Sequence, residues 1–392
     1  MKSDIIYNCL FGGGAVRGAA HVGVLMALQE MDINLGIVGG SSVGSIVASL
    51  YAVGYSVEEL SDIFISVNFE LFRDISFGIN GNFALSKGDV FLDWIRDLIE
   101  QKFYGDSYKK GHNNPVRFKD LSKELLIITT DIKNFKYCEF SSFETPDFEV
   151  AMAVRISCCM PGLMRAVELN EKLLVDGDLL RGRPMFTLSK NLESSDRKIL
   201  EIRLEGDFSG NDSNPIEYVN GMYSCITHTE TDFMHNLYRN SDNVEYLPIN
   251  TGEVVVVDFN YPVDKRKQII NRGYEQTKDY FLNVLPAKSK YLYFTYKSLG
   301  DILTKVCNSF RRKKYSAAKA QFAELFIILY DAGTNLSPKI YESVSQLKNL
   351  IYSNVREGLL GISTCTNQEI IMSELDKLKT FITEKCESYW IK

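Results

Sequence analysis

The stretch from Gly40 to Gly44, with the sequence GSSVG, fits the pattern G-x-S-x-G that presents a nucleophilic serine. The flanking glycines permit a sharp turn from a strand into a helix, and this turn exposes the hydroxyl group of Ser42. The amino end of the following helix favours the negative charge that develops when a serine attacks a carbonyl group. Alone, the five residues are equally compatible with a glycine turn in which Ser41 or Ser42 caps the helix.

A run of three glycines, Gly12, Gly13 and Gly14, lies between an apolar stretch and a helical pattern. Acyl transfer passes through a tetrahedral oxyanion, which backbone N–H groups stabilise. Consecutive glycines expose such groups without a Cβ in the way, so the run is a candidate oxyanion hole. A phosphate-binding loop fits less well. The stretch lacks the Gly-Lys-Ser/Thr of a Walker loop, and Arg17 stands where G-x-G-x-x-G needs its last glycine.

A serine nucleophile needs a base, which is usually a histidine. The chain has four histidines, His21, His112, His228 and His235. The last two have no evident orienting pattern around them, and Asp176 is the better candidate. The sequence LLVDGDLLRGRP predicts a buried strand that ends in an Asp-Gly turn, which would set a carboxylate at the edge of a sheet. Taken alone, such a turn is common as a purely structural feature.

The candidate residues lie between strands and helices that alternate along the chain. The apolar patterns predict strands at 5–11, 35–41, 124–132, 172–177 and 253–259, and helices at 19–31, 43–54 and 90–103. The order strand, helix, strand, helix over residues 5–54 predicts an α/β fold with a mostly parallel central sheet flanked by helices. The glycine run after the first strand would then lie beside the serine turn after the next.

The chain changes character after Pro286, where strand patterns give way to helical ones. We therefore predict a catalytic domain over residues 1–285 and a helical C-terminal region over 286–392. Residues 286–392 carry 16 Lys and Arg against 10 Asp and Glu, a net charge of +6, whereas the whole chain carries −6. The densest basic cluster comprises Arg311, Arg312, Lys313 and Lys314, within a helical pattern. It is a candidate for docking on an anionic membrane, and the alternatives are a solvated helix face, a short basic loop or a protein contact.

Composition limits the kinds of protein that this chain can be. The 392 residues are 45% hydrophobic and 24% charged, as in globular domains. The eight cysteines include no CxxC pair, so we expect free thiols, no metal site and no cofactor. No apolar run reaches the roughly 18 residues that span a bilayer, and the N-terminus lacks a Sec-type signal pattern. We expect a cytoplasmic or peripheral membrane protein, although secretion by another route stays open, and no nucleic acid partner.

Taken together, these stretches resemble the patatin-like phospholipase family. GGGAVRG (12–18) is similar to the family's glycine-rich oxyanion loop with its basic residue, GSSVG (40–44) to its nucleophile elbow, and VDGD (175–178) to its Asp-Gly-Gly/Ala sequence. Similarity extends over 153–177 and, more weakly, 252–281, so it covers about residues 1–285. One departure is Asp178, which stands where the family usually has Gly or Ala and whose charge would repel that of Asp176.

The resemblance implies a Ser–Asp dyad that works without a histidine. Ser42 would attack an ester carbonyl, Asp176 would take its proton, and N–H groups of Gly12, Gly13, Gly14 and Ala15 would hold the oxyanion. Arg17, followed by Gly18, would shape the loop or contact a phosphate.

The implied activity is that of a lipid acyl hydrolase, a phospholipase A or lysophospholipase, acting on glycerophospholipids or lysophospholipids. The alternatives are an acyltransferase at the same site, or a membrane- or protein-binding module with a vestigial site. No sequence feature indicates a protein activator or a homo-oligomer.

Overall fold

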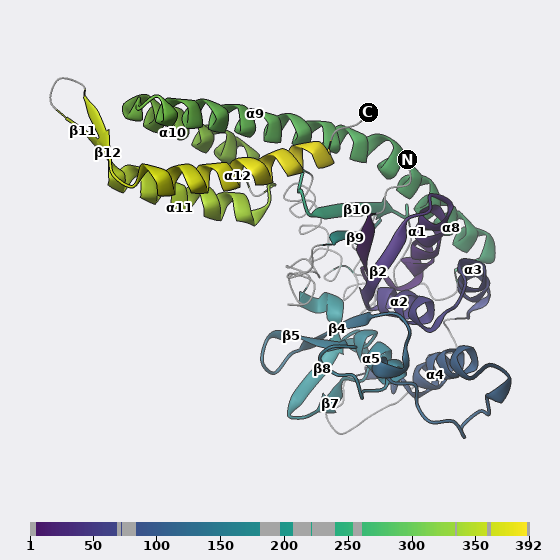
Figure 1. Ribbon diagram of the computed structural model, residues 1–392. Helices are drawn as coiled ribbons and strands as arrows, with labels where there is room; N and C mark the ends of the chain where they lie inside the picture. Colours follow the sequence, from purple (N-terminus) through teal and green to yellow (C-terminus); the bar gives the residue numbers. More distant parts are fainter. Residues whose placement is uncertain are drawn as a thin grey trace. The chain divides into compact units, whose positions relative to one another are not determined.

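The structure is a computed structural model that describes residues 5–68, 72, 84–180, 197–206, 221, 240–253, 261–333, 335–358 and 362–389. The chain divides into two compact units (Figure 1). The first comprises residues 1–236 and 244–280, and the second comprises residues 237–243 and 281–392. The short segment 237–243 thus belongs to the second unit, which no sequence pattern indicates.

The first unit is built on a sheet with the strand order β10-β9-β1-β2-β4-β8-β7, and β5 also pairs with β4. The strands are β1 (Ile6–Phe11), β2 (Asn34–Ser41), β4 (Leu125–Asp131), β5 (Lys136–Ser141), β7 (Val167–Leu169), β8 (Lys172–Asp176), β9 (Lys198–Glu205) and β10 (Val244–Asn250). Neighbours from β10 to β4 run parallel, whereas β5, β7 and β8 pair antiparallel. The predicted α/β fold with a mostly parallel sheet is confirmed.

Helices flank this sheet in two packed groups, α1 with α3 and α8, and α2 with α4 and α5. Their bounds are α1 (Ala19–Glu30), α2 (Val43–Val53), α3 (Val57–Ser66), α4 (Asp89–Tyr104), α5 (Val150–Ser157) and α8 (Val263–Asp279), and two short strands, β3 (Ala84–Ser86) and β6 (Gly162–Met164), pair separately. The predicted helices at 19–31, 43–54 and 90–103 and the first four predicted strands are confirmed. Residues 254–259 of the fifth lie outside the described residues.

Helices α1 and α8 pack with their backbones in contact. A Cβ atom on Gly23 of α1 would lie 1.8 Å from the carbonyl oxygen of Ile270, and one on Gly273 of α8 would lie 2.1 Å from that of Ala20. Neither space holds a methyl group, so these two glycines set the separation of the helices. Helix α8 is polar along most of its length, which explains why a hydrophobic pattern did not predict it.

In its described residues, the second unit contains four helices and a hairpin. Helices α9 (Leu285–Arg311), α10 (Tyr315–Ala332), α11 (Pro338–Asn354) and α12 (Gln368–Ser388) enclose a continuous apolar core that includes Leu299, Phe322, Ile340 and Leu375. The helical character predicted for this region is confirmed. The sequence did not predict the hairpin of β11 (Val355–Glu357) and β12 (Ser363–Cys365), which joins α11 to α12.

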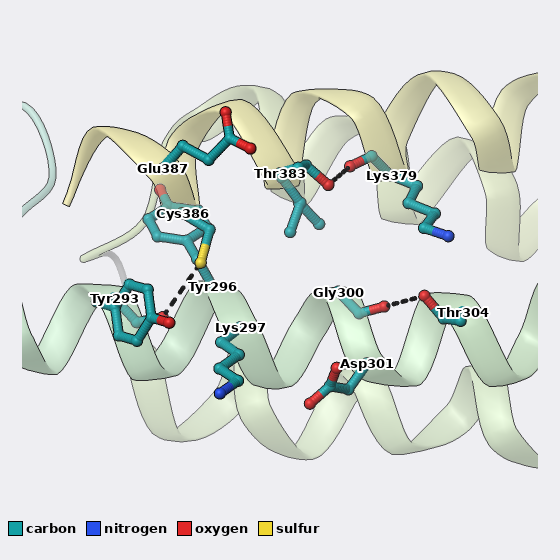
Figure 2. A pocket seen from close by; sticks show the side chains of 11 residues that line it. Tyr293, Tyr296, Lys297, Gly300, Asp301, Thr304, Lys379, Thr383, Cys386 and Glu387 are labelled. Atoms are coloured by element: carbon teal, nitrogen blue, oxygen red, sulfur yellow. Dashed lines mark hydrogen bonds between the residues drawn. The ribbon is translucent and has the colours of Figure 1, made fainter. Parts of the chain in front are cut away.

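A hollow of about 310 Å³ lies between α9 and α12 (Figure 2). It opens over Gly300 of α9, where the helix has no side chain, and Lys297 and Lys379 lie along it. The nearest side-chain atom to a Cβ on Gly300 would be Ile382 Cγ2 at 3.7 Å, an ordinary contact distance. An alanine therefore fits at Gly300 without displacing its neighbours.

Asp242 ties the segment 240–243 to the helices of the second unit. Its buried carboxylate accepts a hydrogen bond from Tyr296 at 2.8 Å and another from Tyr389, and it lies 2.8 Å from Lys385 Nζ. Burial acts to raise the pKa of Asp242, but the charge of Lys385 and the hydrogen bonds from these three side chains outweigh burial and lower the pKa. The folded unit therefore favours the ionised carboxylate.

Replacing Gly23 by alanine is expected to lower the free energy of unfolding by about 1–3 kcal/mol, because the added methyl group would overlap the backbone of α8. Urea unfolding followed by circular dichroism measures this change. The matched control is Gly300→Ala, also inside a helix but with room for the methyl group, which should raise the free energy of unfolding by up to about 1 kcal/mol. Equal effects of the two substitutions would contradict the close packing of α1 and α8.

Asp242→Asn is expected to destabilise the second unit at about pH 7 by roughly 1–3 kcal/mol, because it removes the charge that Lys385 faces. A carboxylate whose pKa is lowered by folding contributes stability above its ordinary pKa, and the contribution is lost as the pH falls through the folded-state value. Thermal unfolding at several pH values should therefore show the two proteins converging below about pH 4. Asp301→Asn, at an exposed position of α9, is the control and should show no such convergence.

Candidate active site

Ser42 lies at the carboxyl end of β2, where the chain turns into α2. Its backbone has φ 52° and ψ −129°, an unusual conformation for a residue with a side chain. Although Ser42 stands at the N-cap position of α2, its side chain makes no capping hydrogen bond. Its Oγ instead donates to Oδ2 of Asp176 at 2.7 Å. The hydroxyl is thus directed at a carboxylate across the site rather than at its own helix.

Close backbone contacts hold this turn in place. A Cβ on Gly40 would lie 2.3 Å from the carbonyl carbon of Gly44, and one on Gly44 would lie 1.9 Å from the carbonyl oxygen of Phe11. Ser157, at the end of α5, accepts a hydrogen bond from the Ser42 N–H at 2.9 Å and donates to the Ile128 carbonyl at 2.7 Å. These contacts explain both glycines of the G-x-S-x-G pattern. Ser157 belongs to the stretch 153–177 that resembles the family, but the sequence does not predict its supporting role.

Asp176 ends β8, which runs antiparallel to β4. It pairs with Thr129, one residue beyond Ile128, and Ile128 pairs with Ser41 of β2. This register brings Asp176 level with the residue that follows Ser41. One oxygen, Oδ1, accepts the N–H of Asp178 at 2.8 Å, and the other faces Ser42. The carboxylate is completely buried, so its orientation is fixed by these partners.

The glycine run follows β1 directly and lies beside the serine turn, because Phe11 pairs with Gly40 in the parallel register. A Cβ on Gly13 would lie 2.9 Å from Ser42 Cβ, so the backbone at Gly13 touches the serine. The carbonyl of Gly12 accepts a hydrogen bond from His21 Nε2 at 2.7 Å. The loop thus lies next to the Ser42 hydroxyl. The prediction of Gly12 as an oxyanion donor is wrong, because its N–H donates to the Ile202 carbonyl of β9 at 2.9 Å.

Arg17 lies in the short 3₁₀ turn (Ala15–Gly18) that follows the glycines, and only 6% of its surface is exposed. Its Nε donates to the carbonyl of Gly14 at 3.3 Å, and Ala15 adopts a positive φ of 47°. A Cβ on Gly18 would lie 2.1 Å from Val43 Cγ2, so the turn packs closely on the start of α2. These contacts favour loop shaping over phosphate binding as the role of Arg17.

In the described part of the chain, neither histidine takes the place of a triad base at the Ser42 hydroxyl. His21 is buried and engages Gly12, and His112 is exposed in the turn after α4. His228 and His235 lie outside the described residues. The described partner of the Ser42 hydroxyl is a carboxylate.

Two adjacent cysteines, Cys158 and Cys159, follow Ser157 near the site. Burial raises the pKa of Cys158 well above its usual value and that of Cys159 to about 12, so both are neutral thiols at physiological pH. The seven cysteines that the structure describes are all free. Within the same described residues, no group of three His, Cys, Asp or Glu side chains is arranged to hold a metal ion.

Arg311 is the last residue of α9, and Arg312, Lys313 and Lys314 form the turn that leads to α10. The helical pattern predicted for the four residues is therefore wrong beyond Arg311, where the alternative of a short basic loop applies. Helix α9 ends at Arg311, Lys313 has a φ of 55°, and Lys314 caps α10. No glycine or proline marks this turn in the sequence. All four side chains are exposed, and Arg311 Nη2 lies 3.6 Å from Asp376 Oδ1. None of the described helices is long and apolar enough to cross a membrane.

Residues 10–188 match the family model described as patatin-like phospholipase. The uncharacterized protein YqhO of Bacillus subtilis is 25% identical over 291 residues, which covers 69% of this chain and 96% of YqhO. The lysophospholipase NTE1 of Saccharomyces cerevisiae is 25% identical over 262 residues, which covers 64% of this chain and 14% of NTE1.

Among solved structures, VipD from Legionella pneumophila aligns with a TM-score of 0.53 at 14% identity, and the alignment covers 98% of this chain and 88% of VipD. This likeness concerns the fold. The family match covers the glycine run, the serine turn and the Asp-Gly turn, which form the site described above. Residues 10–188 therefore correspond to a patatin-like phospholipase domain, and this match supports lipid ester hydrolysis as the class of activity.

Proposed function

We propose that the protein hydrolyses fatty acyl esters of glycerophospholipids or lysophospholipids through Ser42 and Asp176, with an acyl-enzyme intermediate. The observation that carries the proposal is the 2.7 Å hydrogen bond from Ser42 Oγ to Asp176 Oδ2. A nucleophile bonded to a base, with the base oriented by a third group, is the arrangement that activates a serine. The name lysophospholipase of the relative NTE1 supports this substrate class.

In the first half of the reaction, Asp176 takes the proton of the Ser42 hydroxyl as Oγ attacks the ester carbonyl. The carbonyl oxygen becomes an oxyanion, which the N–H groups of Gly13, Gly14 and Ala15 stabilise, since that of Gly12 donates to the Ile202 carbonyl. The tetrahedral intermediate then collapses, the bond to the alcohol breaks, and Asp176 returns its proton to the departing alcohol oxygen. The acyl group remains on Ser42 as an ester.

In the second half, Asp176 takes a proton from a water molecule, which attacks the acyl-enzyme. The oxyanion forms again at the same loop, and its collapse releases the fatty acid and returns the proton to Ser42 Oγ. The amino end of α2 lies behind the serine and favours the negative charge in both halves. The hydrogen-bonded dyad argues against a vestigial site.

We further propose that the basic turn, Arg311–Lys314, docks the protein on anionic lipid. The hairpin lies beside this turn, since the Ser316 N–H donates to Ser363 Oγ at 3.2 Å. Ile362, which precedes β12, is 66% exposed. Exposed basic side chains next to an exposed apolar one suit the boundary between lipid head groups and acyl chains.

Ser42→Ala and Asp176→Asn are each expected to lower the kcat for lysophosphatidylcholine hydrolysis at least about a thousandfold, because the two groups act as one unit. Release of fatty acid measures the loss. The matched controls are Ser49→Ala and Asp131→Asn. Ser49 is a buried serine of α2 that donates to the Ile46 carbonyl, and Asp131 is a buried aspartate of β4, the strand next to β8. A folded Asp176→Asn protein that keeps a tenth or more of the wild-type rate would remove Asp176 from the mechanism.

Changing Arg311, Arg312, Lys313 and Lys314 to Glu should weaken binding to vesicles of phosphatidylcholine and phosphatidylserine at least about tenfold at low salt, since each basic residue near such a surface contributes about 1 kcal/mol. Vesicle co-sedimentation measures the binding. Turnover of a soluble p-nitrophenyl ester should stay within about twofold of wild type, and binding to vesicles of phosphatidylcholine alone is the control. Unchanged binding to the anionic vesicles would exclude this turn as the docking site.

A further inference from the structure

We propose that Asp178 is a positioning residue, which acts through a buried ion-pair bridge with Arg203 and Glu201 to hold the glycine loop and the Asp176 turn together. The inference rests on the proposed function, since it concerns the geometry of the same site. Unlike Ser42 and Asp176, the residues of the bridge contact neither the transferred proton nor the substrate ester.

The three side chains are charged and almost fully buried, with exposed fractions of 2% for Asp178, 3% for Arg203 and 0% for Glu201. Arg203 Nε and Nη2 donate to Glu201 Oε1 at 2.9 and 2.6 Å, and Arg203 Nη1 lies 3.9 Å from Asp178 Oδ1. Charges this deeply buried are costly unless they are paired. Arg203 therefore lies between the two carboxylates and is a cation that both of them face.

The bridge lies across the end of the sheet at which the site is found. Asp178 belongs to the 3₁₀ turn (Gly177–Leu180) that follows β8, whereas Arg203 and Glu201 belong to β9. Three strands, β1, β2 and β4, separate β9 from β8 in the sheet (Figure 1). Gly177 lies against the Ile128 carbonyl of β4 and the Ser41 hydroxyl of β2, so the turn brings Asp178 over these strands toward Arg203. The glycine loop and Ser42 lie at the same end of the sheet.

The bridge also touches both parts of the catalytic arrangement. The N–H of Asp178 holds Asp176 Oδ1 at 2.8 Å, and Asp178 Oδ2 lies 2.3 Å from the position that a Cβ on Gly13 would take. Arg203 Cδ lies 3.0 Å from the corresponding position on Gly12. The side chains of the bridge therefore pack directly against the backbone of the glycine loop, while the backbone of the same turn orients the base.

A glycine or alanine at position 178 would keep the N–H to Asp176 but has no group that reaches Arg203. The carboxylate thus adds a contact between two segments that the turn alone does not link. It also places a negative charge near the developing oxyanion, which would slow the reaction if positioning were not its role. If Asp178 positions the site, removing its charge should lower kcat. If it only repels the oxyanion, removing its charge should raise kcat.

The test is Asp178→Asn, which keeps the shape of the side chain and removes its charge. We expect the kcat for lysophosphatidylcholine, and the rate at which a fluorophosphonate probe labels Ser42, both to fall at least about tenfold, with KM within about twofold of wild type. The matched control is Glu245→Gln. Glu245 is a buried carboxylate that lies 3.4 Å from Lys198, at the opposite end of β9, and its substitution should leave kcat unchanged.

A second variant, Glu201→Gln with Arg203→Met, removes the rest of the bridge while keeping the charge balance. If the three residues act together, adding Asp178→Asn to this variant should cause no further loss of kcat. An unchanged or raised kcat in Asp178→Asn, or fully additive losses, would overturn the proposal.

The labelling rate separates this inference from the proposed function. Loss of labelling in Ser42→Ala would show that the probe labels the wild-type protein at Ser42. If that wild-type protein releases no fatty acid from phospholipids, the proposed substrate is contradicted. The effect of Asp178→Asn on the labelling rate would still decide the role of the bridge. A wild-type protein that is neither labelled nor hydrolytic would overturn both.

Discussion

The register of the central strands is the constraint on which the site depends. Phe11 of β1 pairs with Gly40 of β2, and Thr129 of β4 pairs with Asp176 of β8. Because side chains alternate across a strand, a slip of one residue at β8 would turn Asp176 to the other face and away from Ser42. A slip at β1 would move the glycine loop along the serine turn, where the backbones are already in contact. The sheet therefore sets the position of all three segments at once.

Burial gives these segments their fixed orientations. Asp176, Asp178 and Glu201 are carboxylates at positions that water hardly reaches, and Arg203 lies against the last two. A buried charge without partners is costly, so each such group tolerates few orientations. Asp176 is satisfied by one backbone N–H and by the Ser42 hydroxyl. Burying these charges costs free energy on folding, and the same burial restricts each side chain to few orientations in the folded protein.

Local patterns in the sequence predict those parts of the site that depend on local structure. Ser42 and Asp176 each follow an apolar strand pattern and have a glycine within two residues, so strand ends and turns locate both, although they are 134 residues apart. Local patterns do not locate Arg203, because it reaches the site only through the pairing of β9 with β1. Ser157 is likewise identified by a contact between distant segments. The helical pattern fails at the basic turn because Lys313 adopts a positive φ, and no glycine in the sequence indicates it.

A serine that relies on a carboxylate instead of an imidazole still needs its base to be oriented. In a Ser-His-Asp triad a side chain holds the base, as the aspartate holds the histidine. Here the N–H of Asp178 holds Asp176 Oδ1 and leaves Oδ2 for the serine. Because a backbone group does this, any residue except proline at position 178 can supply it. The side chain at 178 is thereby released from the orienting role, and in this chain it is a carboxylate that reaches across the sheet to Arg203.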